Sequence, residues 1–115
     1  MISTNNNYNK TNFGMAVKAT PQAMEVLESR LTKRGAKKLN KIVEAQKNNP
    51  TDIHLNRFKG TVYADVAGKR FNPMHILEEL EDSSWSIVKM VKKAAKHADN
   101  HTAKQNIIKN FNIEA

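Results

Sequence analysis

Residues 20–31 place apolar side chains at the spacing of an amphipathic α-helix. The shared face holds Met24, Leu27 and Leu31. Thr20 is a residue type that caps helix N-termini, and Pro21 suits the first turn because its missing N–H would be unpaired there anyway. The pattern therefore predicts a first helix that begins directly after Thr20.

A second helical pattern follows in residues 32–49, with its apolar face rotated by about 100° from that of the first on one helical wheel. A straight helix cannot turn its apolar side away from itself, so we expect a break between Thr32 and Gly35. Thr32 then caps the new helix, which ends at Asn48–Asn49 before Pro50. Its inward side is formed by Ala36, Leu39, Ile42, Val43 and Gln46.

After Pro50 the apolar period changes from helical to alternating, which is typical of strands. Ile53 and Leu55 alternate with polar residues, and a second alternating run covers residues 61–66. A two-residue turn at Ala67–Gly68 would place Val66 opposite Lys69 and Ala64 opposite Phe71. The segment predicts an antiparallel meander of two or three strands whose apolar face must be covered by helices.

Helical spacing returns in the C-terminal part of the chain. Asn72 and Pro73 suit a helix start over residues 72–82, and Asp82–Ser84 suits a break with a second cap. The next helix should bury Ile87, Val91, Ala94 and Ala98. The last apolar residues no longer match this phase, so they predict either a separate short helix or a tail that orders on a partner. They are Ala103, Ile107, Ile108 and Phe111.

The expected fold is α+β: a small antiparallel meander of two to three strands, packed by four or five short amphipathic helices. Residues 1–18 are expected to form a disordered, Asn-rich tail, although Phe13–Val17 could instead dock as a short strand. Residues 19–115 are expected to form a single α+β domain, in which residues 99–115 could be a loosely docked C-terminal helix. The expected core is Leu27, Leu31, Leu39, Ile42, Val43, Ile53, Leu55, Val62, Val66, Phe71, Leu77, Leu80, Trp85, Val88 and Val91.

Composition removes several classes of function. The chain of 115 residues has no cysteine, which excludes disulfides, thiolate metal sites and cysteine nucleophiles. It shows no secretory signal and no apolar run near the roughly 20 residues of a membrane span, so a cytoplasmic address without membrane contact is expected. No phosphate-binding glycine loop or nucleophile motif occurs, and we expect neither an enzyme nor a cofactor.

The net charge of +8 raises the question of a polyanionic partner. Fifteen of the nineteen basic residues are Lys, and Asn occurs fourteen times, a bias that an AT-rich coding sequence also produces. The basic residues nevertheless gather on two helix faces and one hairpin. The candidate polyanion-binding residues are Arg30, Lys33, Arg34, Lys37, Lys38, Lys41, Lys69, Arg70, Lys89, Lys92, Lys93 and Lys96.

Three other features carry weaker chemical signals. His97 and His101 are four residues apart, but two ligands do not make a metal site and a helix end is expected at Asp99–Asn100. Trp85 is expected to be a core or edge anchor, and the alternative is a half-exposed tryptophan that marks a partner groove. The one acidic cluster is expected to be solvated, or to serve as a patch for a second copy. It contains Glu78, Glu79, Glu81 and Asp82.

These observations predict a noncatalytic binding module, with protein interaction or self-association as the leading hypothesis. The partner is then another protein or a second copy of the chain. The alternative is nucleic-acid or other polyanion binding through the Lys-rich helix faces. The two hypotheses separate on one geometric question, namely whether the two Lys faces point to the same side of the molecule.

Overall fold

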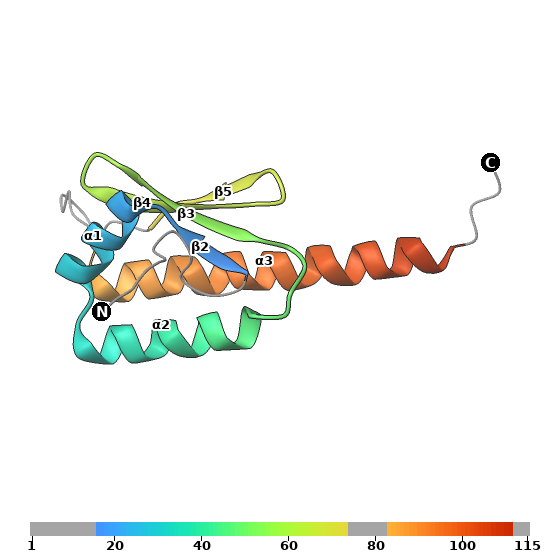
Figure 1. Cartoon of the computed structure of the whole chain (residues 1–115), viewed down its shortest axis with the longest axis horizontal. Helices are drawn as coiled ribbons and strands as arrows, with labels where there is room; N and C mark the ends of the chain where they lie inside the picture. The colour runs from blue at the N-terminus through green and yellow to red at the C-terminus, as the bar shows by residue number, and fades with distance from the viewer. Residues whose placement is uncertain (1–15, 74–82, 112–115) are drawn as a thin grey trace.

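The computed structural model describes residues 16–73 and 83–111 and has two layers, a four-stranded sheet and three helices on one of its faces (Figure 1). The strand order is β2-β3-β4-β5, with β2 parallel to β3 and the other neighbours antiparallel. Helices α1 and α3 pack on the sheet, and α2 packs on α3. The predicted α+β class is therefore confirmed.

The first two helices begin where their caps predict. Thr20 caps α1 (Pro21–Arg30), its hydroxyl accepting the N–H of Ala23 at 3.1 Å. The chain then becomes extended at Leu31 and Thr32, and Thr32 caps α2 (Lys33–Gln46) by accepting the N–H of Gly35 at 3.0 Å. The break deduced from the rotated apolar faces is confirmed, while α2 ends slightly before the expected Asn48–Asn49.

The meander is formed by β3 (Ile53–Phe58), β4 (Thr61–Val66) and β5 (Lys69–Phe71). Val66 pairs with Lys69 and Ala64 with Phe71, in the predicted register. Ala67 and Gly68 both have positive φ, at 48° and 83°, as a two-residue hairpin that matches the twist of the strands requires.

The predicted strand count and purely antiparallel sheet are wrong, because a fourth strand adds to the meander. β2 (Val17–Ala19) pairs in parallel with β3, and Val17 lies opposite Ile53. A parallel pair needs a long crossover, and α1 and α2 together supply it. The C-terminal boundary predicted for the tail, residue 18, is therefore too far along the chain, since Val17 and Lys18 belong to the sheet. Residues 1–15 lie outside the described part.

The predicted helix count also differs, since the described residues contain three helices rather than four or five. α3 (Ser84–Asn110) begins with a capping box between Ser83 and Ser86 and continues without the break expected at Asp99–Asn100. The separate final helix is thus the end of α3. The helix predicted over residues 72–82 falls largely outside the described residues.

The core lies between the sheet and the helices, and it includes Leu39 and Val91, which are 1% and 0% exposed. Trp85 is the clear correction, because it is 52% exposed. It lies on the side of α3 opposite the buried Ile87 and Val91, and Met90 is in the core instead. Leu77 and Leu80 lie outside the described residues. Partly buried members of the predicted core are Leu31, Ile42, Phe71 and Val88.

Candidate nucleic-acid interface

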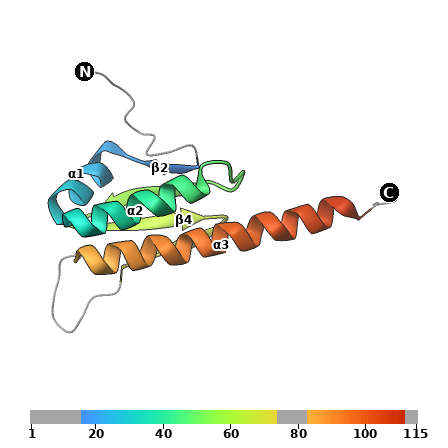
Figure 2. The same ribbon diagram turned by 90° about the horizontal axis from the view of Figure 1, so that it is seen from below.

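Helices α2 and α3 run side by side and in the same direction beneath the sheet (Figure 2). At their N-terminal ends the backbone N–H of Thr32 donates to Ser84 Oγ at 3.1 Å. At the other end of α2, Gln46 Nε2 donates to Asp99 Oδ1 at 3.0 Å, and Gln46 is buried. Polar contacts at both ends thus fix the alignment of the two helices.

Gly35 allows the close approach of the two helices at this end. A Cβ atom at this position would lie 2.0 Å from Ser84 Oγ, far inside van der Waals contact. Gly35, which the sequence indicated only as a boundary of the expected break, therefore lets Ser84 reach the N-terminus of α2. The hydrogen bond of Ser84 to Thr32 depends on that space.

The basic residues of both helices point away from the sheet. On a helical wheel of 100° per residue, the buried positions of α2 centre on one side and its basic positions on the opposite side, and the same holds for α3. Because both helices cover the same face of the sheet, their two basic sides lie on the same side of the molecule. We call this the basic helix surface, formed by Lys33, Arg34, Lys37, Lys38, Lys41, Lys89, Lys92, Lys93 and Lys96, all exposed.

Acidic partners are scarce on this surface. In the described part of the chain, the ion pairs use other cations, for example Lys18 with Asp52 at 3.0 Å and Lys47 with Glu44 at 3.8 Å. The nine residues of the basic helix surface make none of these described pairs. None of the described ion pairs therefore engages these nine cations.

Trp85 belongs to the same side of α3 as the lysines. Its wheel position falls between those of Lys92 and Lys96, and the Lys89 ammonium lies 4.7 Å from the centre of its ring. A half-exposed indole beside cations is the arrangement with which proteins stack unpaired bases. Sequence reasoning favoured the buried alternative for Trp85 because it weighted the hydrophobicity of the residue above its phase on the helix.

Three of the candidate basic residues lie elsewhere. Arg30 is half-buried at the end of α1, and Lys69 lies on β5 with its ammonium 5.2 Å from the centre of the Phe71 ring. Arg70 is on the open face of the sheet, where its Nε donates to Asp65 Oδ1 at 2.9 Å. The side-chain hydrogen bond with Asp65 raises the pKa of Arg70.

The histidine pair carries no described metal centre. His97 and His101 lie on one unbroken helix, and the His97 ring packs at 5.5 Å from the ring of Phe71. Among the residues described here, no group of three or more His, Asp or Glu side chains could hold a metal ion. The acidic cluster of residues 78–82 lies outside the described part.

Within the described residues, no helix is both long and apolar enough to cross a lipid bilayer. Comparison of the chain with protein-family models, with curated proteins and with solved structures finds no match.

Proposed function

We propose that the chain is a noncatalytic nucleic-acid-binding module that contacts the phosphate backbone through the basic helix surface. One observation carries the proposal. The two Lys-bearing helix faces lie on the same side of the molecule, and none of the described ion pairs engages their cations. Phosphate neutralisation by such a surface is the main source of sequence-independent affinity for nucleic acids.

The residue types favour contact with phosphate over reading of bases. Eight of the nine residues are Lys, a compact point charge on a flexible stem, and Arg34 is the exception. Bidentate recognition of guanine is mainly a property of Arg, so the surface suits the backbone of many sequences. Trp85 at the end of this surface offers a stacking site for an unpaired base, and stacking of this kind tolerates any base.

The placement of these groups supports a binding role. The lysines are exposed on the outer sides of α2 and α3, on a surface formed by two packed helices. General acid–base or nucleophilic use of a lysine needs a partner and partial desolvation to shift its pKa. The proposed role requires only charge and accessibility.

The hypothesis of protein interaction or self-association is supported by a different feature, the exposed apolar end of α3. That feature lies beyond the region where α2 packs on α3, so both activities fit one molecule.

Fluorescence anisotropy with labelled mixed-sequence duplexes and single strands, of both RNA and DNA, tests the proposal. We expect binding whose log K falls linearly with log salt between about 50 mM and 200 mM, because each neutralised phosphate releases counterions. Absence of binding at low salt, or binding without a salt slope, would contradict a phosphate-driven mechanism.

A further inference from the structure

The C-terminal end of α3 carries apolar side chains that nothing in the described structure covers. From Ala103 to Asn110 every residue is exposed, and the helix extends past the sheet and past α2 (Figure 1). Ile107, Ile108 and Phe111 are 57%, 46% and 61% exposed. We call these three residues the α3 tip. Large apolar side chains grouped in this way mark sites of association.

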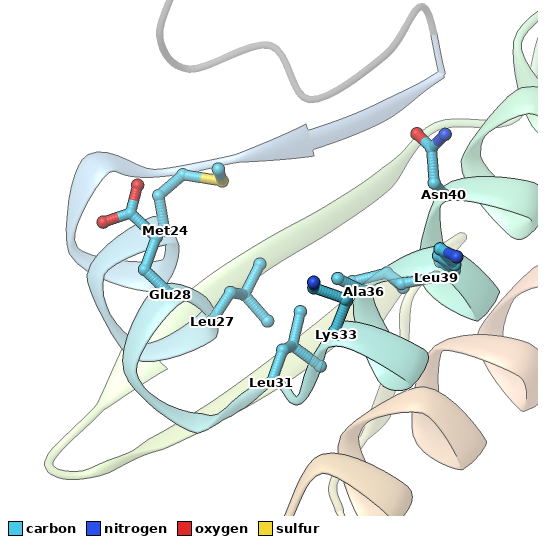
Figure 3. Close-up of a pocket in the computed structure, with 9 residues that line it drawn as sticks. Met24, Leu27, Glu28, Leu31, Lys33, Ala36, Leu39 and Asn40 are labelled. Atoms are coloured by element: carbon cyan, nitrogen blue, oxygen red, sulfur yellow. The ribbon is translucent and has the colours of Figure 1, made fainter.

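A groove of matching chemistry lies between α1 and α2 (Figure 3). It has a volume of about 500 Å³ and is lined mainly by apolar side chains. Its apolar lining comes from Met24, Leu27, Leu31, Ala36 and Leu39, and Glu28, Lys33, Lys37 and Asn40 complete it. A cavity of about 150 Å³ accommodates one benzene ring, so this groove has room for a phenyl ring and neighbouring aliphatic groups.

The α3 tip cannot reach the groove of its own chain. The groove adjoins Thr32, which is hydrogen-bonded to Ser84 at the first turn of α3. Phe111 follows Ser84 by 27 residues of α3, which is about 40 Å along a helix that rises about 1.5 Å per residue. The exposed tip and the open groove therefore lie at opposite ends of the molecule.

We propose that the occupant of the groove is the α3 tip of a second copy of the chain, in a reciprocal dimer with two tip-in-groove contacts. Reciprocal exchange closes a two-fold assembly, whereas a one-way contact would continue into a chain of copies. The apolar surface area that each arrangement would bury favours this dimer over direct pairing of two tips. One tip exposes on the order of 300 Å² of apolar surface, so two tips alone fall far below the roughly 1,200 Å² of a stable interface.

Insertion into the groove covers more surface on both partners. Each contact buries the tip and also the outer parts of Met24 and Leu31, which are only partly buried in one copy. Two such contacts bring the buried area into the range of weak but specific dimers. The inference does not depend on nucleic-acid binding, since the contact uses apolar side chains of α1, of α2 and of the end of α3. Lys33 and Lys37 are the two members of the basic helix surface that also line the groove.

Sedimentation velocity over a concentration series tests the proposal with one variant on each side of the contact. The tip variant, Ile107→Ser with Phe111→Ser, replaces two of the three apolar side chains of the α3 tip. Ala36→Glu places a charge in the groove and leaves the core unchanged, because Ala36 is exposed. We expect the wild-type chain to dimerise. In each variant the dissociation constant of the dimer should rise by about tenfold or more, as it does when a hot-spot residue is lost. Ala45→Glu, on an exposed part of α2 outside the groove, is the matched control and should dimerise as the wild type does.

Mixing the two variants gives the sharper result. The Ala36→Glu chain keeps its tip and the tip variant keeps its groove, so the two chains can form one intact contact. The mixture should therefore associate more tightly than either variant does alone, but more weakly than the wild-type chain, which forms two contacts. A wild-type chain that stays monomeric at every concentration would overturn the proposal. So would an Ala36→Glu variant that dimerises normally while the tip variant does not, because that outcome indicates direct pairing of tips. Circular dichroism confirms that each variant is folded.

Discussion

Ser84 Oγ accepts the backbone N–H of Thr32 at 3.1 Å and lies 3.2 Å from the Thr32 hydroxyl. The first residue of α3 is thereby tied to the N-cap of α2, although 52 positions separate them in the chain. This contact aligns the N-terminal ends of the two helices, and so aligns the basic side of one helix with that of the other. Parallel helices also bring two positive dipole ends together there, which favours a nearby anion.

The space beside Ser84 predicts an unusual response to a glycine substitution. Gly35→Ala would ordinarily stabilise a helix by up to about 1 kcal/mol. Here the added methyl meets Ser84 Oγ at 2.0 Å, and overpacking costs about 1–3 kcal/mol. We expect a net loss of roughly 1–3 kcal/mol in the free energy of unfolding, measured by urea denaturation.

Gly60→Ala provides the control, because a methyl group at Gly60 would contact nothing within 4 Å. That variant should be neutral or slightly more stable, by up to about 1 kcal/mol, through the lower entropy of its unfolded chain. A Gly35→Ala variant as stable as the wild type would mean that Ser84 turns away at no cost. The alignment of α2 and α3 would then not depend on this contact.

The same contact predicts coupling between two substitutions. Ser84→Ala removes the acceptor of the Thr32 N–H and should cost about 0.5–1.5 kcal/mol. It also removes the atom at 2.0 Å from the methyl group of Gly35→Ala, so the nearest remaining atoms are Thr32 Oγ1 at 3.2 Å and the Cβ of residue 84 at 3.4 Å. The double variant should therefore be more stable than the sum of the two single effects predicts, by at least about 1 kcal/mol in a double-mutant cycle. Additive effects would show that the collision is relieved in some other way.

Local signals predicted those parts of the fold that neighbouring residues determine. The caps at Thr20 and Thr32 and the hairpin at Ala67–Gly68 each combine a residue type with a fixed offset, so sequence and structure agree there. β2 has only three residues, too few for a period, and its pairing with β3 depends on the crossover through two helices. A contact of that kind is not encoded in any local pattern.

The sequence predicted which residues belong to the candidate site, but not how the two helices orient them in space. The lysine positions on α2 and α3 follow from helical spacing, yet their common orientation follows from the packing of α2 on α3. Trp85 is different, because its phase on the helix already groups it with Lys89 and opposite Ile87. Its exposure could have been deduced from the sequence, whereas the separation of Arg70 from the helix surface could not, since it needs the sheet.

Charge reversal on the basic helix surface tests whether its two halves act together. On the helical wheel, Lys38 and Lys92 are the basic residues closest to the line where α2 and α3 meet. Lys38→Glu with Lys92→Glu should weaken nucleic-acid binding strongly and reduce the magnitude of the salt slope by roughly 2, because about two phosphate contacts are lost. Both side chains are exposed, so the free energy of unfolding should change little.

The matched control reverses two lysines at the hairpin ends of the sheet. Lys59→Glu with Lys69→Glu changes the net charge by the same amount, but neither residue belongs to the basic helix surface. It should weaken binding much less than the Lys38 and Lys92 pair does. Equal losses in the two variants would show that only total charge matters and that the helix surface has no special role.

Trp85 is the only tryptophan of the chain, and it is half-exposed beside Lys89, so its fluorescence reports directly on the proposed surface. A single-stranded nucleic acid that stacks a base on this ring should quench its emission and protect it from iodide, whereas a duplex should do so less because its bases are already stacked. Trp85→Ala should weaken single-strand binding by about 1–3 kcal/mol and leave the salt slope unchanged, since stacking releases no counterions. Trp85→Phe keeps a stacking face and should restore most of the affinity. If Trp85→Ala weakened duplex and single-strand binding alike, or changed the salt slope, the ring would be supporting the position of Lys89 rather than contacting a base.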